Sequence, residues 1–208
     1  MIKKFLALLV VVVFTLAFPS INTSGKEENK KEVEIELKYE SPFSAPLQTI
    51  PPELLRTPYS EKISVLVNQK QKQKIDGQLM NMEEEIKMLA QVAKAEAGGI
   101  AEISHQAAPI WCVLNRVDRG FHDSIKQVIK VPGAFAWRSG TKVNDHFISL
   151  ARDVLARWLL EKEGFENVGR VLPAEYCFFN GYNGYNHYRI DYKSEGRWDW
   201  SLPSPYES

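Results

Sequence analysis

Apolar residues recur at steps of three and four between Met82 and Lys162, the spacing that places side chains on one face of an α-helix. The pattern predicts four helices, at residues 82–97, 105–119, 124–130 and 145–162. Ser104 is the expected N-cap of the second helix, because its hydroxyl can accept a hydrogen bond from a free amide of the first turn. The chain is therefore expected to be mainly α-helical, with one folded domain at residues 81–208.

The C-terminal stretch is rich in aromatic residues. Ten of them lie between residues 176 and 206: Tyr176, Phe178, Phe179, Tyr182, Tyr185, Tyr188, Tyr192, Trp198, Trp200 and Tyr206. Glycines and asparagines interleave them in FFNGYNGYNHY, which predicts a short β element followed by ordered loops, and hence an α+β domain. Such a stretch could form a sugar-binding wall, since flat rings stack on pyranose faces. The alternative is that these rings are ordinary core and turn residues.

The first 24 residues have the layout of a secretory signal. Lys3 and Lys4 precede an apolar run of 14 residues, from Phe5 to Phe18. This run is shorter than the ~20 residues that span a bilayer. We expect it to direct export, either as a cleaved signal or as an N-terminal membrane anchor, so that the folded domain lies outside the membrane.

Residues 25–80 are expected to form a linker. Prolines are dense between residues 41 and 58, and the run at 68–74 is polar, NQKQKQK. Proline at this density favours an extended spacer. On this interpretation the folded domain begins near Asn81.

Charge and composition exclude several functions. Lys plus Arg and Asp plus Glu each number 26, so no net field recruits nucleic acid or an anionic surface. The four histidines match no compact ligand spacing, and neither a metal nor another cofactor is expected. Cys112 and Cys177 could pair after export or remain buried free thiols. A Cys177 nucleophile beside His187 is disfavoured, because apolar surroundings raise the pKa of a thiol.

Glu96 is the strongest candidate for a catalytic residue. It borders the apolar stripe of the first helix, three residues beyond Ala93, and Gly98 and Gly99 follow it. Burial and the negative end of the helix dipole both favour the protonated carboxyl group. A carboxylic acid that keeps its proton near neutral pH is what general-acid catalysis requires. The alternative is that Glu96 is a solvated glutamate at a helix end.

A longer sequence pattern surrounds Glu96. Residues 89–117, LAQVAKAEAGGIAEISHQAAPIWCVLNRV, hold an Ala-Glu-Ala-x-Gly core, then Gln106 opening an alanine-rich helix that ends in Leu-Asn-Arg-Val. The PGAF of residues 132–135 and the aromatic segment 176–180 follow. Taken together, residues 85–190 resemble the SleB-like (spore-cortex-lytic) cell wall hydrolase family.

The resemblance implies a lysozyme-like, mainly helical fold that cleaves the glycan strand of peptidoglycan between N-acetylmuramic acid and N-acetylglucosamine. By analogy with the family, the reaction is lytic transglycosylation, in which the muramic acid 6-hydroxyl attacks its own anomeric carbon. One residue, here Glu96, then protonates the leaving oxygen and afterwards deprotonates that hydroxyl. The residues expected to hold the sugar are Gln106, Asn115, Phe135, Phe179, Asn180, Tyr182, Tyr185 and Tyr188.

The sequence departs from the family pattern at the second acid. Ile100 stands directly after the glycine, where the family usually has an acid, and Glu102 follows two places later. Glu102 is therefore the candidate for a second carboxylate, which a hydrolase needs at a set separation from the first. Two alternatives follow: a muramidase that uses Glu96 with Glu102, and a non-catalytic wall-binding module that uses the C-terminal aromatic rings. Vegetative wall, spore cortex and a phage's host wall all fit as targets, and no protein partner is indicated.

Overall fold

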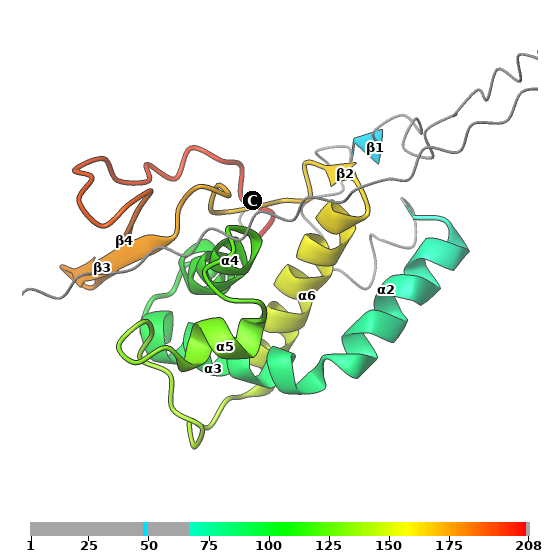
Figure 1. Cartoon of the computed structure of the whole chain (residues 1–208), viewed down its shortest axis with the longest axis horizontal. Helices are drawn as coiled ribbons and strands as arrows, with labels where there is room; N and C mark the ends of the chain where they lie inside the picture. The colour runs from blue at the N-terminus through cyan, green and yellow to red at the C-terminus, as the bar shows by residue number, and fades with distance from the viewer. Residues whose placement is uncertain (1–47, 50–66, 207–208) are drawn as a thin grey trace, which may run out of the picture. The chain divides into compact units, whose positions relative to one another are not determined.

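The computed structural model describes residues 48–49 and 67–206 (Figure 1). The helices of this part are α2 (Gln69–Asn81), α3 (Glu83–Ala97), α4 (Ile103–Asp118), α5 (Ile125–Lys130) and α6 (Asp145–Lys162). The strands are β1 (Gln48–Thr49), β2 (Phe165–Glu166), β3 (Phe178–Tyr182) and β4 (Tyr185–Arg189). β1 pairs with β2 in parallel, and β3 and β4 form an antiparallel hairpin. The predicted mainly α-helical domain with a small β element near the C-terminus is confirmed.

The core lies where α3, α4 and α6 meet. Trp111 of α4 and Leu89 of α3 are fully buried there, together with Leu155 of α6. Each helix presents an apolar stripe to the other two, which is the packing that the three- and four-residue spacing predicts. The α3–α4–α6 arrangement fixes the end of α3, and with it Glu96.

The N-terminus of α4 differs from the prediction. α4 begins at Ile103, and its N-cap is Glu102, whose side chain makes no capping hydrogen bond. Ser104, the expected N-cap, is buried inside the first turn, and its Oγ lies 2.6 Å from the Oγ of Ser204. The hydroxyl therefore ties α4 to the C-terminal segment.

α2 is the largest difference from the prediction. The sequence between residues 25 and 80 was expected to be a linker, but its last part is a helix that carries Ile75 and Leu79 into the core. A capping box starts the helix, in which Asn68 Oδ1 accepts from the amide of Gln71 at 2.9 Å. α2 packs against α6 and α3 (Figure 1). The folded part therefore begins at or before Val67 rather than near Asn81.

The sequence signal for α2 lies in four apolar residues. Ile75, Leu79, Met82 and Ile86 follow one another at steps of four, three and four, so the stripe of α3 extends toward the N-terminus. The polar run at 68–74 conceals this stripe, because its side chains form the solvated start of the helix.

Shortening Ile75 tests whether α2 belongs to the folded unit. Ile75→Val is expected to lower the free energy of unfolding by about 0.5–1.5 kcal/mol, because a buried methyl group is lost. Met80→Ala is the matched control, since Met80 is 73% exposed on the same helix. Urea unfolding of both variants checks the difference. Equal stability of the two variants would contradict the packing of α2.

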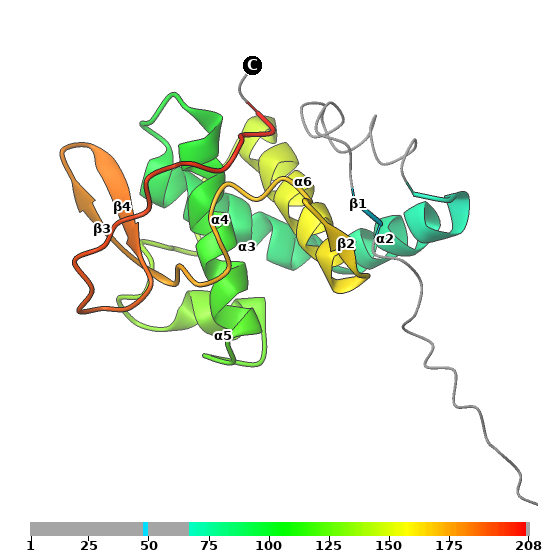
Figure 2. The ribbon, with the colours of Figure 1, turned by 90° about the horizontal axis from the view of Figure 1, so that it is seen from above.

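The C-terminal segment after the hairpin runs back across the helices, as the red trace in Figure 2 shows. Trp198 Nε1 donates to the carbonyl of Val171 at 3.0 Å, and the hydroxyl of Tyr206 donates to Asp153 of α6 at 2.7 Å. These bonds anchor the C-terminal segment to the connection after β2 and to α6. The hairpin is thereby held next to the end of α3.

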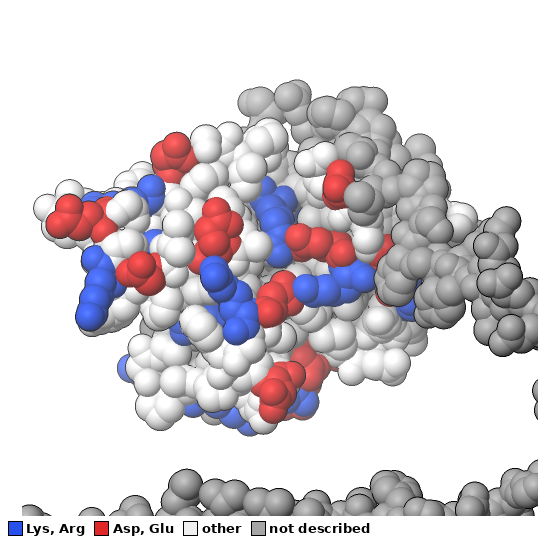
Figure 3. Space-filling view, turned by 45° about the horizontal axis from the view of Figure 1, so that its top comes forward, with Lys and Arg blue, Asp and Glu red and all other residues white. Residues whose placement is uncertain are grey.

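On the face shown in Figure 3, acidic and basic side chains are interspersed rather than gathered by sign. The predicted signal at residues 1–24 and most of the predicted linker lie outside the described residues. Within the described part of the chain, no helix combines the length and apolar content needed to cross a bilayer.

Candidate functional site

Glu96 lies in the last turn of α3, facing the hairpin and the segment that follows α5. Its side chain is half-buried. The backbone N–H of Ala136 donates to its Oε1. Its backbone carbonyl accepts a hydrogen bond from Asn186 Nδ2 of β4 at 3.0 Å. Two segments that are distant in sequence therefore bind Glu96, one at its carboxyl group and the other at its backbone carbonyl.

The pKa of Glu96 is raised above its ordinary value of 4.5. Burial is the main cause, because the charged form loses its hydration. The Ala136 N–H and the Arg116 guanidinium act in the opposite direction, since both stabilise the anion. No second carboxylate is among the described groups that shift this pKa. In the part of the chain that the structure describes, the site therefore contains one carboxyl group, that of Glu96. Burial favours its protonated form, and Ala136 and Arg116 stabilise its anion.

The hairpin places its side chains by simple alternation. Asn183 and Gly184 form its two-residue turn, with φ of 51° and 80°, as this turn requires. Asn186 and Tyr188 point toward the body and are buried, at 6% and 1% exposure. Asn186 therefore reaches the backbone of Glu96 at the end of α3. Burial raises the pKa of the Tyr188 hydroxyl well above its usual value.

The other predicted hairpin residues lie at different depths. Phe179 is half-buried, and its ring centroid is 5.2 Å from that of Tyr188. Asn180 is half-buried and accepts from Arg189 Nη2 at 2.5 Å. Tyr182 and Tyr185 are 58% and 44% exposed at the tip. Among the residues predicted to hold sugar, Tyr182 and Tyr185 have exposed rings, whereas Tyr188 is too deeply buried to contact a ligand. Tyr192, another ring of the aromatic stretch, is 83% exposed.

Asn115 serves the fold rather than a ligand. It is fully buried, and its Nδ2 donates to the carbonyls of Pro173 and Tyr176 at 2.8 and 2.9 Å. Its Oδ1 accepts from Arg170 at 2.8 Å. The prediction that Asn115 holds sugar is corrected, because all of its polar atoms already bind protein groups that anchor the start of the hairpin.

Gln106 is also occupied by protein contacts. Its Nε2 donates to the carbonyl of Ile100 at 2.6 Å, and its Oε1 lies 2.6 Å from Nε2 of His146. Gln106 is 7% exposed. It fixes the turn between α3 and α4, directly after Glu96, so its effect on a ligand is indirect.

Glu102 is exposed and faces a cavity other than the Glu96 site. The cavity has a volume of about 100 Å³, and Ser104, His105 and Trp200 also line it. Glu96 is not part of its lining. The structure therefore does not bring the two candidate carboxylates to one cavity.

Phe135 connects the segment after α5 to the hairpin. Its ring centroid lies 5.9 Å from that of Phe179 and 4.6 Å from Cζ of Arg116. Phe135 is buried, and the next residue, Ala136, is exposed. Phe135 therefore supports the amide that binds Glu96.

Both cysteines are buried free thiols. Burial raises the pKa of Cys112 to about 12 and also raises the pKa of Cys177. Cys112 Sγ donates to the carbonyl of Cys177 at 3.3 Å. The two thiols pack α4 against the hairpin, and thiols with raised pKa are poor nucleophiles.

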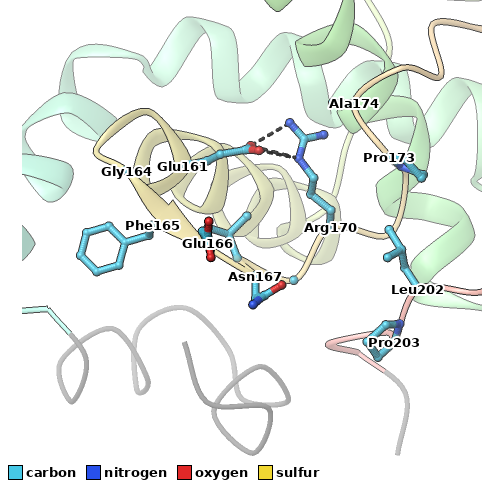
Figure 4. Close-up of a pocket in the computed structure, with 12 residues that line it drawn as sticks. Glu161, Gly164, Phe165, Glu166, Asn167, Arg170, Pro173, Ala174, Leu202 and Pro203 are labelled. Atoms are coloured by element: carbon cyan, nitrogen blue, oxygen red, sulfur yellow. Dashed lines mark hydrogen bonds and ion pairs between the residues drawn. The ribbon is translucent and has the colours of Figure 1, made fainter. Parts of the chain in front are cut away.

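A cavity of about 730 Å³ lies at the far end of α6, lined in part by Glu161, Phe165, Arg170 and Leu202 (Figure 4). The Glu161 carboxylate accepts from the Arg170 guanidinium at 2.7 and 3.0 Å. Glu161 is thus held in an ion pair with Arg170. Among residues 67–206, no three His, Cys, Asp or Glu side chains gather closely enough to bind a metal ion.

Sequence reasoning missed the partners of Glu96. Ala136 acts through its backbone N–H, which no residue type reveals. Asn186 lies within the predicted aromatic stretch, but its amide binds the chain rather than a sugar. Arg116 belongs to the Leu-Asn-Arg-Val motif, which was the available signal for it.

Comparison with known proteins adds no relative. No family model matches the sequence, and no curated protein or solved structure matches it. The fold and the site define a mainly α-helical domain with a half-buried acid at a helix end beneath a β-hairpin. The resemblance to the SleB-like family stays a prediction from the motifs.

The raised pKa of Glu96 predicts a pH-dependent stability. The folded state binds this proton more tightly than the unfolded chain, so stability falls as the pH rises from 4.5 through the folded-state pKa. Glu96→Gln removes the titration. We expect the stability of the variant relative to the parent to increase between pH 4 and pH 7, measured by urea unfolding. A constant difference over this range would contradict the burial of the carboxyl group.

Proposed function

We propose that this chain cleaves the glycan strand of peptidoglycan as a lytic transglycosylase, through a lysozyme-like helical domain. The observation that carries the proposal is the single half-buried carboxyl group of Glu96, with its raised pKa and the Ala136 N–H on its Oε1. A carboxyl group with a raised pKa keeps its proton to higher pH than an ordinary glutamate, as a general acid requires, and its anion is stabilised here by the Ala136 N–H and by Arg116.

One such acid can complete the reaction. In the first step Glu96 transfers its proton to the glycosidic oxygen as the bond from that oxygen to C1 of N-acetylmuramic acid breaks. In the second step the 6-hydroxyl of the same sugar attacks C1, and the Glu96 carboxylate takes the hydroxyl proton. Glu96 ends protonated, and the product carries a 1,6-anhydro ring without consuming water. Because the nucleophile belongs to the substrate, a second carboxylate is not required.

The surroundings of Glu96 support a sugar substrate. Tyr182 and Tyr185 are exposed on the hairpin whose inner face binds Glu96. Aromatic rings stack on pyranose faces, and phenol groups meet hydroxyls. These two rings are therefore the proposed sugar contacts, and Phe179 and Asn180 are half-buried on the same hairpin.

The placement of Glu102 favours transglycosylation over hydrolysis. A hydrolase with a water or covalent step needs two carboxyl groups that flank one bond. Glu102 lines a cavity in which Glu96 takes no part. A muramidase mechanism built on this pair is for that reason less well supported than the one-acid mechanism.

The proposal is tested by the chemistry of the products. The purified full-length chain is incubated with vegetative cell walls and, in parallel, with spore cortex, and the released muropeptides are measured by mass spectrometry. Anhydro ends support the proposal. Reducing ends, which contain an added water, would establish a muramidase, and binding without lysis would leave a wall-binding module. The preferred wall preparation also identifies the target of an exported or membrane-anchored enzyme.

A further inference from the structure

Arg116 contacts two segments near Glu96, the one that contains Phe135 and the one that contains Cys177 and Phe178. Its side chain leaves the last turn of α4 and is half-buried. Its Nε donates to the carbonyl of Cys177 at 2.7 Å, just before β3. Its guanidinium carbon lies 4.6 Å from the ring centroid of Phe135 and 5.5 Å from that of Phe178. A planar cation between two aromatic rings and a carbonyl has little freedom to move.

The contact between Arg116 and Phe135 is connected to the Glu96 carboxyl group through the next residue, Ala136. Phe135 is covalently followed by Ala136, whose N–H donates to Glu96 Oε1. A contact that holds the Phe135 ring in place therefore also restrains the backbone amide of Ala136, which binds the Glu96 carboxyl group. This link is indirect, since Arg116 is not hydrogen-bonded to Glu96 among the described interactions.

Arg116 also supplies the fixed charge at the site. Among the described residues, the other titratable groups that interact with Glu96 are Cys112 of α4 and Tyr188 of β4. Burial raises the pKa of both, so both are neutral near pH 7. Lys94, on the same helix as Glu96, lies over the Phe147 ring at 5.3 Å. The positive charge that acts on the Glu96 carboxylate is therefore that of Arg116.

We propose that Arg116 is a positioning residue for Glu96, holding Phe135 so that the Ala136 N–H meets the carboxylate, and balancing the negative charge left when Glu96 gives up its proton. The second half of this inference rests on the proposed function, because it assigns a proton transfer to Glu96. The first half does not depend on any substrate. Burial alone disfavours the Glu96 anion, and the positive charge of Arg116 acts in the opposite direction.

The test measures the ionisation of Glu96 directly, in the full-length chain without substrate. The carboxyl carbon of Glu96 and the amide of Ala136 are followed by NMR over a pH titration in the parent, Arg116→Met and Arg116→Lys. Arg119→Met is the matched control, because Arg119 donates to the carbonyl of Glu175 at 3.2 Å on the same helix end but does not act on Glu96.

In Arg116→Met, we expect the pKa of Glu96 to shift upward, because a stabilising positive charge is lost. In Arg116→Lys the charge remains, so the upward shift is expected to be smaller than in Arg116→Met. In the parent and in Arg119→Met, the Ala136 amide follows the Glu96 titration with the parent pKa. A Glu96 pKa that is the same in the parent and in Arg116→Met would overturn the electrostatic role.

Phe135→Leu keeps the proposal testable if Arg116→Met does not fold. This variant retains the guanidinium but removes the ring that it holds, so the Ala136 amide is expected to lose its response to Glu96 ionisation. An unchanged response would overturn the positioning role.

In enzyme assays, the alkaline limb of kcat/KM is expected to move to higher pH in Arg116→Met, with KM unchanged. Failure of all lysis together with a shifted Glu96 pKa would reject the proposed function while leaving the role of Arg116 intact.

Discussion

Glu96→Gln is expected to reduce the release of anhydro-muropeptides by about 10²–10⁴-fold, the contribution typical of general acid–base catalysis. The amide has nearly the shape of the protonated carboxyl group, but it neither donates a proton to the glycosidic oxygen nor accepts one from the 6-hydroxyl. The loss is expected in kcat, with little change in KM. Initial rates of product formation on purified cell walls, measured by mass spectrometry, check this prediction.

Glu102→Gln provides the matched control for this experiment. Glu102 is a glutamate of the same connection between α3 and α4, but it is exposed and lines another cavity. Its variant is expected to retain the parental rate. Equal losses in the two variants would indicate that the enzyme uses two carboxylates, and a parental rate in Glu96→Gln would reject the proposed mechanism.

The location of Glu96 could be predicted because it depends on local sequence. The apolar stripe defines the buried face of α3, and Gly98 and Gly99 mark the end of the helix. An acid beside that face must be partly desolvated, whatever the rest of the fold. The direction of its pKa shift follows from the same two facts. α6 likewise spans residues 145–162 as predicted, since its apolar stripe runs unbroken between an asparagine cap and a glycine.

The partners of Glu96 could not be predicted, because they are tertiary contacts. Ala136 follows Glu96 by 40 residues and Asn186 by 90, and the atoms involved are a backbone amide and a backbone carbonyl. Tertiary contacts also explain why Asn115 and Gln106 were wrongly expected to bind a sugar directly. Their amides are suited to sugar hydroxyls, but they are equally suited to backbone carbonyls, and burial decided which they bind.

α2 was not predicted, because the polar residues at 68–74 concealed the apolar periodicity of residues 75–86. The lysines and glutamines of residues 69–74 form the exposed face of the first turns, whereas Ile75 and Leu79 carry the packing. Most helical stability in proteins comes from such tertiary packing rather than from the composition of one turn. The helix is indicated when residues 75–86 are considered together, because the three- and four-residue spacing of apolar residues continues from α2 into α3.

Arg157→Met is expected to lower the free energy of unfolding by about 3–5 kcal/mol, the cost typical of removing one partner of a buried ion pair. Arg157 Nε lies 2.7 Å from Oδ2 of Asp153, and the two side chains are 6% and 10% exposed. Arg157 Nη1 also donates to the carbonyl of Val168 at 2.9 Å. The variant therefore leaves a buried carboxylate without its neutralising guanidinium and a buried carbonyl without this donor. Urea unfolding monitored by tryptophan fluorescence measures the loss.

Arg152→Met separates burial from the simple loss of an arginine. Arg152 lies on the same helix, α6, and pairs with Glu83 at 2.5 Å, but the two side chains are 37% and 56% exposed. Water already solvates both charges, so this variant is expected to lose less than about 1 kcal/mol. A similar loss in both variants would show that the Arg157–Asp153 pair is hydrated in solution. The bond from Tyr206 to Asp153 would then no longer anchor the C-terminal segment, and the hairpin above Glu96 would lose one of the contacts that hold it in place.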